Sequence, residues 1–392
     1  MEKQKKQVLF LTRTLGRAGV GVSLMSLLKV IDFDKYDLTL GVQFPEKGLE
    51  KEVPECVNII YYGEITSPLY KKIFDYNSAL AKRRHNPVQT LVWHLLNRLE
   101  EWRMVYKVRR CFKKKYDTAV AYHQGMASKY VMNHTKADKK IMWYHASVIE
   151  RPWYKELFRK ADKVITDSEN ARRVMLGEWG SEFEEKIVSM NCVIPLDDIL
   201  LKSEQRTEFE KDESKTLILS CGRLGEEKGM DIAAKAAGII KEKQPDFKFE
   251  WIIVGDGSER AKIEKIIADF GLEKQFKLLG FQLNPYPYFK ICDIYVQPSR
   301  LEAFGLTMAE AMCFNKPVIT TATAGGKENI TDGENGLVCD IDENALANSV
   351  LKMVNDKPLR EKIIANITAD DYRKEIEKKR EFVNSVLDSD IK

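Results

Sequence analysis

Two glutamates eight positions apart are the residues of this chain best placed to do chemistry. Glu302 and Glu310 lie in the segment 293–310, which has the pattern of a buried strand, a loop and a helix start. If most of the span is helical, eight residues rise roughly 12 Å. That distance is comparable to the separation of the sugar and the ribose in a nucleotide diphosphate sugar, so one carboxylate could bind each end. The simpler alternative is that both glutamates decorate a solvated helix.

Groups that favour phosphate lie near these glutamates. Phe304, Gly305, Leu306 and Thr307 stand at the expected helix N-terminus, where free N–H groups and the helix dipole favour an anion. Arg223 and Lys228 follow an earlier predicted strand. A guanidinium and an ammonium group can neutralise the charge that grows on a leaving nucleotide. The alternative for this pair is ordinary solvated charge.

The elements that must position these residues alternate between strand and helix twice along the chain. The apolar runs predict strands at 8–11, 38–44, 57–61, 118–122, 141–144 and 164–166, and then at 217–220, 251–254, 276–279, 294–297 and 317–320. Helical patterns at 230–243, 258–270, 285–291 and 306–314 separate the strands of the second series. The fold class is therefore α/β, with two doubly wound Rossmann-like domains that face a central cleft.

The domain boundaries follow from the same pattern. An N-terminal domain at 1–197 is followed by a polar linker at 198–215, which is rich in Asp, Glu, Lys and Ser. A C-terminal domain follows at 216–370, and a last helix lies at 371–392. In such sheets, ligands bind beyond the carboxyl ends of the strands, so chemistry is expected in the strand-to-helix turns.

The segment from Glu302 to Glu310, Glu-Ala-Phe-Gly-Leu-Thr-Met-Ala-Glu, resembles the E-x7-E signature of retaining glycosyltransferases of the GT-B fold, the family 4 type. Further matching pieces occur in the family's order: Gly222-Arg223-Leu224 with Lys228-Gly229, Val254-Gly255-Asp256-Gly257, Leu279-Gly280-Phe281, Gly325-Gly326 and Asp332-Gly333-Glu334-Asn335-Gly336. The resemblance is strong over 216–340 and weaker over 7–195.

The resemblance implies a role for each matching residue. Glu302 would contact hydroxyl groups of the donor sugar, and Glu310 would bind the ribose hydroxyls. Arg223 and Lys228 would hold the diphosphate, together with the backbone of residues 304–307. The region of Phe281 would hold the base, largely through backbone groups, so its side chain could equally belong to the core.

Two residues depart from the family pattern. Asn315 stands where relatives often have glycine after the helix, and asparagine is the next best residue for a left-handed C-cap. Ala303 also stands where glycine is frequent. Its methyl group would lie beside the sugar and narrow the choice of donor.

The N-terminal half offers three further candidates. Gly19 and Gly21, in a G-x-x-G-x-G stretch that starts at Gly16, resemble the family's glycine loop facing the donor phosphates; the alternative is a plain tight turn. His145 ends a predicted strand and matches the family's histidine beside the reacting sugar, where the alternative is a structural histidine. His123 is a weaker candidate for the acceptor side.

Length and composition are those of a globular protein of two domains. The chain has 392 residues, 44% hydrophobic and 31% charged. The apolar run near the start, 8–11, is too short for a secretory or membrane-spanning segment, so we expect a cytoplasmic protein. Its seven cysteines are scattered without a C-x-x-C pair and are expected to be reduced thiols.

Positive charge gathers in the first half of the chain. Residues 1–200 hold 34 Lys and Arg against 25 Asp and Glu, and residues 71–115 hold 13 against 3. The basic segment 69–115 interleaves these charges with Leu91, Val92, Trp93, Leu95, Leu96, Leu99 and Trp102. This amphipathic pattern suits an anionic membrane surface at the inner face of the cell membrane. The alternative is a helix packed on its own domain; a nucleic-acid partner is not expected, because no reader module is present.

The resemblance implies an enzyme, a retaining hexosyltransferase that moves a sugar from a nucleotide diphosphate sugar to an acceptor hydroxyl. The expected acceptor is a glycan or a lipid-linked or cell-surface polysaccharide precursor, since many family members use lipid-linked acceptors. UDP and GDP both remain open as the nucleotide. No D-x-D stands at the end of a predicted strand, so we expect no metal and no cofactor. The alternatives are an epimerase or hydrolase acting on the same donors, and a non-catalytic membrane scaffold.

Overall fold

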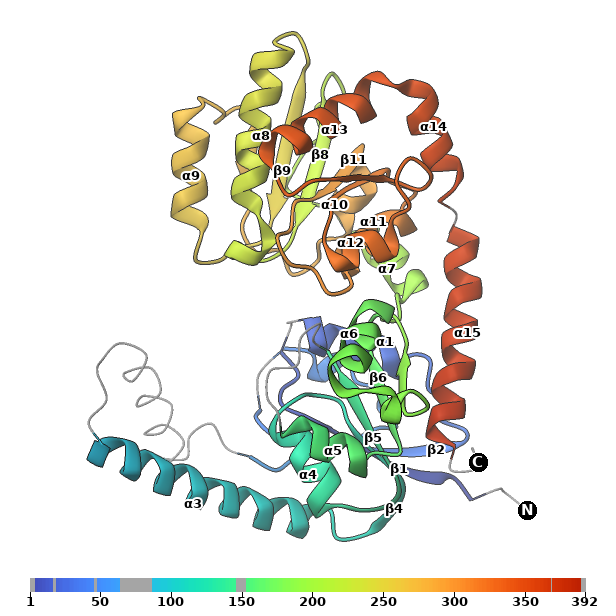
Figure 1. The fold of residues 1–392 in the computed structure, drawn as a ribbon. Helices are drawn as coiled ribbons and strands as arrows, with labels where there is room; N and C mark the ends of the chain where they lie inside the picture. Colours follow the sequence, from blue (N-terminus) through green and yellow to red (C-terminus); the bar gives the residue numbers. More distant parts are fainter. Residues whose placement is uncertain are drawn as a thin grey trace. The chain divides into compact units, whose positions relative to one another are not determined.

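The chain folds into two compact units (Figure 1). This computed structural model describes residues 4–16, 19–45, 48–63, 87–145, 153–367 and 369–388. The first unit comprises Met1–Asp167, Ala171–Met190 and Lys379–Lys392, and the second comprises Ser168–Asn170 and Asn191–Lys378. The predicted linker 198–215 thus begins inside helix α7 (Leu196–Ser203), which belongs to the second unit.

A parallel sheet forms the centre of the first unit. Within the described ranges it has seven strands in the order β3-β2-β1-β4-β5-β6-β7. Their bounds are β1 (Lys6–Thr12), β2 (Tyr36–Val42), β3 (Asn58–Tyr61), β4 (Lys115–Ala121), β5 (Lys136–Tyr144), β6 (Lys163–Thr166) and β7 (Ile187–Ser189). The helices are α1 (Gly19–Leu28), α3 (Pro87–Cys111), α4 (Met126–His134), α5 (Tyr154–Lys160) and α6 (Glu169–Trp179). Central strands such as β1 are apolar along most of their length because both of their faces are covered.

The second unit repeats this plan. Its described part contains a six-stranded parallel sheet in the order β10-β9-β8-β11-β12-β13. The strands are β8 (Thr216–Cys221), β9 (Phe249–Val254), β10 (Phe276–Leu278), β11 (Ile294–Gln297), β12 (Val318–Thr321) and β13 (Leu337–Cys339). The helices after α7 are α8 (Met230–Lys243), α9 (Arg260–Asp269), α10 (Tyr286–Ile291), α11 (Leu306–Cys313), α12 (Ala324–Asn329), α13 (Glu343–Asn355) and α14 (Lys357–Ala365). The last helix, α15 (Ala369–Leu387), begins in the second unit, and its residues from Lys379 on belong to the first.

The two sheets confirm the predicted α/β architecture of two doubly wound domains. Every strand expected from the apolar runs is present, and α8 has the predicted bounds. The short strands β7 and β13 were not predicted, because three residues give too little pattern to separate a strand from a loop. Asn315 has φ 54°, which confirms the left-handed C-cap after α11.

The basic segment falls only partly within the described residues. Helix α3 begins at Pro87, where the missing N–H and fixed φ of proline suit the first turn. Residues 69–86 of the segment lie outside the described ranges. Among the described residues, no helix combines the length and the apolar character needed to cross a bilayer.

Candidate active site

The strand order places the candidate site of the second unit at its topological switch point. From β8 the chain moves to β9 and β10 on one side, and from β11 it moves to β12 and β13 on the other. Right-handed crossovers put the helices that follow on opposite faces of the sheet, and ligands of such sheets bind beyond the carboxyl ends of the strands at this point. Arg223 and Lys228 follow β8, and Glu302 follows β11. The fold therefore brings residues from two distant stretches to one edge.

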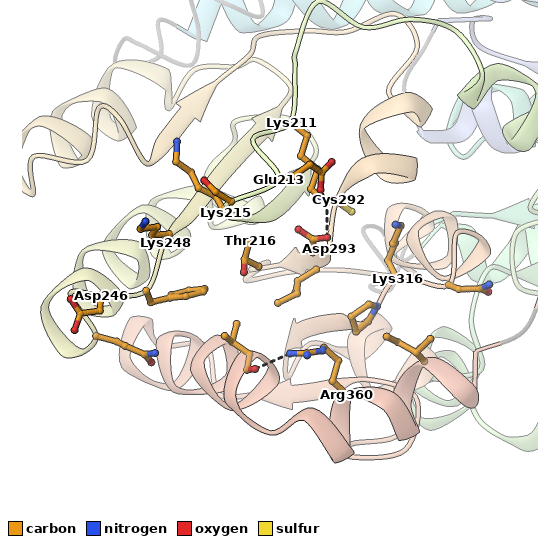
Figure 2. A pocket seen from close by; sticks show the side chains of 18 residues that line it. Lys211, Glu213, Lys215, Thr216, Asp246, Lys248, Cys292, Asp293, Lys316 and Arg360 are labelled. Carbon is orange, nitrogen blue, oxygen red and sulfur yellow. Dashed lines mark hydrogen bonds and ion pairs between the residues drawn. The ribbon is translucent and has the colours of Figure 1, made fainter.

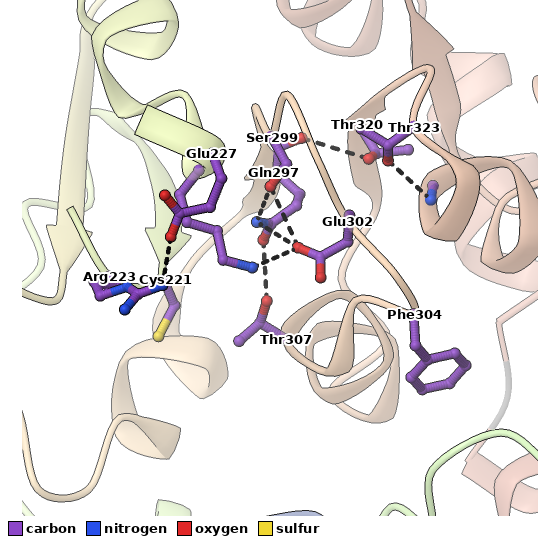
Figure 3. A network of polar contacts seen from close by, with 12 residues as sticks. Cys221, Arg223, Glu227, Gln297, Ser299, Glu302, Phe304, Thr307, Thr320 and Thr323 are labelled. Carbon is purple, nitrogen blue, oxygen red and sulfur yellow. Dashed lines mark hydrogen bonds and ion pairs between the residues drawn. The ribbon is translucent and has the colours of Figure 1, made fainter. Parts of the chain in front are cut away.

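Lys228 and Glu302 form an ion pair at this edge (Figure 3). The Lys228 Nζ donates to Glu302 Oε2 at 2.8 Å, and both side chains are mostly buried. The same carboxylate oxygen accepts from Ser299 Oγ at 3.3 Å and from Gln297 Nε2 at 3.4 Å. All three of these donors bind Oε2, so Oε1 of Glu302 can accept from a further partner.

Three backbone hydrogen bonds hold the loop that carries Glu302. The N–H groups of Arg300 and Leu301 both donate to the Glu227 carbonyl, in the turn that carries Lys228. On the other side, the N–H of Gly325 donates to the Glu302 carbonyl at 2.9 Å. Gly229 permits the first approach, because it has φ 62° and a Cβ there would overlap the Pro298 carbonyl.

Side chains strengthen the contact between the two turns. The Arg300 guanidinium binds both carboxylate oxygens of Asp231, at 2.7 and 2.9 Å, and also donates to the Glu226 carbonyl. Lys262 adds an ion pair to Asp231 at 3.1 Å. Burial opposes ionisation of Asp231, yet these hydrogen bonds hold its pKa to about 2. The Lys228 turn and the Glu302 loop are thereby clamped together.

Helix α11 begins beside the ion pair. Gly305, at φ 87°, starts the helix in a left-handed conformation, and the first N–H groups of α11 have no partner within the helix. The Thr307 Oγ1 donates to Gln297 Oε1 at 3.0 Å, so the same glutamine orients both Thr307 and Glu302. These N–H groups and hydroxyls can bind an anion.

Phe304 has a packing role in this structure. Its ring points away from the Glu302 carboxylate (Figure 3) and is buried in an apolar cluster with Ile194, Leu196 and Ile199. The Phe304 carbonyl accepts from Asn329 Nδ2. Because the ring and the carbonyl of Phe304 are engaged in these contacts, its backbone N–H is the group of this residue that remains a candidate for binding phosphate.

Glu310 is a buried residue of α11. The Tyr286 hydroxyl donates to its Oε1 at 3.2 Å. Burial raises the pKa of Glu310 from 4.5 to about 7, although the tyrosine hydrogen bond opposes this shift. The helix begins at Leu306, as the helical pattern at 306–314 predicted, so the part of the span before Gly305 is a loop and the part after it is helical.

Arg223 and Phe281 are more exposed than the ion pair. The Arg223 side chain is 74% exposed and donates to Glu227 at 2.6 Å. It is therefore in reach of solvent and of an arriving anion. Phe281 is 63% exposed, so its ring does not belong to the core, which was the alternative for this residue.

The candidates of the first unit follow the strands of that sheet. A Cβ at Gly21 would overlap the Gly16 carbonyl, whereas Gly19 meets no atom within 4 Å, so the tight turn requires only Gly21 to be glycine. The His145 Nδ1 contacts Asp167 Oδ2 at 2.7 Å, and its Nε2 contacts the Tyr122 carbonyl at 3.0 Å. The His145 ring is thus held between two oxygen atoms, one from a carboxylate and one from a backbone carbonyl. His123 instead contacts the Gln124 carbonyl through Nδ1.

Sequence reasoning missed the residues that support the site. Gln297, Ser299, Arg300 and Asp231 form the surroundings of Glu302 and Lys228. Gln297 and Ser299 stand within the segment already singled out, where a polar residue at a buried strand end was an available signal. Asp231 lies 69 positions from Arg300, and no local pattern connects them.

A cavity of 840 Å³ lies in the same unit but away from this site (Figure 2). It is lined by Thr216, Lys248, Asp293 and Pro317, which stand at or just before the amino ends of strands. Ligands of doubly wound sheets bind at the opposite, carboxyl ends. Across the described ranges, no cluster of three or more His, Cys, Asp or Glu side chains could hold a metal ion.

Part of the chain matches a known family in sequence. Residues 202–370 match the family "Glycosyl transferases group 1". The lipopolysaccharide core biosynthesis glycosyltransferase LpsE of Rhizobium meliloti is 28% identical over 210 residues, which cover 53% of this chain and 58% of LpsE. The alpha-D-kanosaminyltransferase of Streptomyces kanamyceticus is 28% identical over 168 residues, which cover 42% of this chain and 43% of that transferase. These alignments thus span only about half of each relative.

Solved structures match over nearly the whole chain. HepE of Anabaena, in complex with UDP, has a TM-score of 0.70 at 18% identity and covers 97% of this chain and 99% of HepE. The sucrose-phosphate synthase of Thermosynechococcus elongatus has a TM-score of 0.68 at 16% identity, and the match covers 97% of this chain and 100% of the synthase. The fold is GT-B. In this GT-B chain, the family match covers most of the second unit, including Lys228, Glu302 and Glu310.

Proposed function

We propose that this chain is a glycosyltransferase that moves a sugar from a nucleotide diphosphate sugar to an acceptor hydroxyl with retention of configuration. The observation that carries the proposal is the Lys228–Glu302 pair at the switch point of the second sheet, within a stretch that matches the family. A cation for the diphosphate and a carboxylate for the sugar hydroxyls are the groups such a donor needs.

The proposed donor site uses the predicted residues. Lys228 and Arg223 bind the diphosphate together with N–H groups at the start of α11, and Glu302 binds the sugar hydroxyls. Glu310 accepts from the ribose hydroxyls, and the base lies near Phe281. In the first unit, we propose His145 as a residue that contacts the sugar, and Gly19 and Gly21 as residues that contact the phosphates.

The proposed reaction is a front-face substitution. The bond between the anomeric carbon and the leaving phosphate oxygen breaks, and a bond from the acceptor oxygen forms on the same face. The acceptor proton passes to the leaving phosphate oxygen. Lys228 and Arg223 neutralise the charge that develops on the diphosphate, so we propose that the reaction needs no metal ion.

The proposed acceptor is a lipid-linked or cell-surface polysaccharide precursor at the inner face of the membrane. Two relatives support this class by their names. LpsE takes part in lipopolysaccharide core biosynthesis. A Campylobacter jejuni transferase, 28% identical over 206 residues, uses an acceptor linked to diphospho-undecaprenol. UDP donors are the first to test, because HepE was crystallised with UDP-glucose.

The test is a panel of UDP- and GDP-sugars, scored by release of free nucleotide from the purified chain, with and without a polyprenyl-linked acceptor. We expect one donor to be cleaved and its sugar to appear on the acceptor in the original anomeric configuration, with EDTA present. Release of free sugar alone would indicate a hydrolase, and a changed nucleotide sugar would indicate an epimerase. Binding of no member of the panel would contradict the proposal.

A further inference from the structure

Helix α3 carries a continuous apolar face that is open to solvent. Leu91, Leu95, Leu99, Trp102 and Tyr106 are each between 54% and 73% exposed. They recur every three or four residues and therefore line one side of the helix. Soluble proteins rarely expose large apolar side chains in a contiguous row, and such rows mark interaction sites.

The opposite side of α3 anchors the helix to the first unit. Met104 and Val108 are buried in the core of that unit, and Glu100 is buried beside them. The orientation of the helix is thus set by its buried side, and the apolar face points outward. The exposed row is therefore a second face of α3, distinct from the side that packs on the core of the first unit.

Charge borders this apolar face on both sides. At 100° per residue, Arg98 and Arg109 lie along one edge of the row and Arg110 lies along the other. All three are exposed. The two acidic residues of α3 lie off this face: Glu100 pairs with Arg103, and Glu101 pairs with Lys129 of α4.

We propose that this face of α3 docks on an anionic phospholipid bilayer. The helix lies in the plane of the interface, its apolar row enters the boundary between headgroups and acyl chains, and the bordering arginines bind lipid phosphates. A second copy of the chain fits less well, because the same face on two copies would bring arginines against arginines with no acidic residue between them. The inference goes beyond the proposed function, since it requires no sugar chemistry.

The first experiment is flotation of the full chain with vesicles of phosphatidylcholine, alone or mixed with phosphatidylglycerol. We expect recovery with the anionic vesicles only, and loss of that recovery in the variant Leu95→Glu/Trp102→Glu. Both positions are exposed, so folding does not depend on them. The control Leu201→Glu changes a leucine of α7 that is 73% exposed and should float like the parent.

The second experiment removes charge without touching the apolar row. Each basic residue near an anionic surface contributes about fivefold to binding, so Arg98→Gln/Arg110→Gln should bind anionic vesicles roughly 25-fold more weakly. The control Lys265→Gln/Lys274→Gln removes two exposed lysines of the second unit and should leave binding unchanged. High salt should weaken the parent and the control alike.

Two outcomes would overturn the inference. They are equal recovery with neutral and anionic vesicles, and undiminished recovery of Leu95→Glu/Trp102→Glu. If the recovery of that variant is undiminished and light scattering shows a shift from dimer to monomer, the apolar face binds a second copy of the chain. UDP binding by calorimetry, measured on the same variants, separates this inference from the proposed function, because vesicle binding and nucleotide binding can fail independently.

Discussion

Glu310 is the residue whose chemistry the fold alters most. A carboxyl group with a pKa of about 7 costs free energy whenever it is ionised, and its single described side-chain donor, Tyr286, only partly offsets that cost. Its position on α11, within the stretch that matches the family, fits a carboxylate kept for ribose hydroxyls. If Glu310 binds the ribose as proposed, its burial lowers stability in exchange for donor binding.

The variant Glu310→Gln tests this trade. Because the folded pKa of about 7 lies above 4.5, the native state binds the proton more tightly, and stability is lost as pH rises from 4.5 through 7. Glu310→Gln should match the parent near pH 4.5 and exceed it at pH 8 by on the order of 3 kcal/mol, measured by denaturant unfolding. It should also bind UDP more weakly. A parallel shift in exposed Glu273→Gln would contradict the assignment to burial.

Lys228 is the cation that the proposed reaction depends on most. Removing one group that stabilises developing charge typically lowers kcat by about 10²–10³-fold. We expect Lys228→Ala to show a loss of this size in nucleotide release, and Lys235→Ala, which removes a partly exposed lysine of α8 paired with Glu343, to show none. Full activity of Lys228→Ala would mean that the diphosphate binds elsewhere.

At the scale of elements, two turns from different crossovers act as one structure. The Arg300–Asp231 pair and the backbone bonds to Glu227 join the loop after β11 to the turn after β8. Arg300 is thus a positioning residue, because it acts on the reaction through the Lys228–Glu302 geometry. A displacement of about 1 Å in such a site can cost about 100-fold in rate.

A double-mutant cycle tests this clamp. Arg300→Ala and Asp231→Asn should each lower kcat/KM by about 10–100-fold, and the double variant should lose much less than the product of the two single losses, because both single variants remove the shared Arg300–Asp231 pair. Arg206→Ala, at an exposed position, is the matched control. Additive losses would show that the two residues act separately. Unchanged KM with reduced kcat would favour misplacement of Glu302 over weaker donor binding.

At the scale of the whole molecule, the chain returns to its first unit at the end. The last turns of α15 are bound there: Val383, Val386 and Leu387 are buried, the Tyr36 hydroxyl donates to the Asn384 carbonyl, and the Thr118 hydroxyl donates to the Leu387 carbonyl. Lys6 pairs with Asp388 at 3.1 Å. The first unit is therefore completed by residues that follow the second in sequence.

Leu387→Ala should accordingly destabilise the first unit. A buried leucine truncated to alanine costs about 2–5 kcal/mol, and hydrogen exchange should localise the loss to β1 and β4 and spare β8 and β11. Glu381→Ala, at an exposed position of the same helix, controls for helix propensity. If amides of the second unit lost protection to the same degree, the two units would not unfold separately.

Short sequence patterns, each within a few neighbouring residues, were enough to predict most of the secondary structure and to mark the candidate site. Apolar runs of strand length and helical spacing predicted the two doubly wound domains, and the spacing of Glu302 and Glu310 marked the candidate site, because both kinds of signal are carried by neighbouring residues. The basic and apolar residues of α3 were equally visible in the sequence.

Only the tertiary structure decided which partners these residues have. Lys228 meets Glu302 across 74 positions, Glu310 is buried with a raised pKa, and the apolar row of α3 faces solvent. Burial and pairing depend on which elements pack together, and no local pattern specifies that packing. The sequence thus determined the elements and the chemical groups, while the packing of the sheets and helices decided their charge states, their contacts and their exposure.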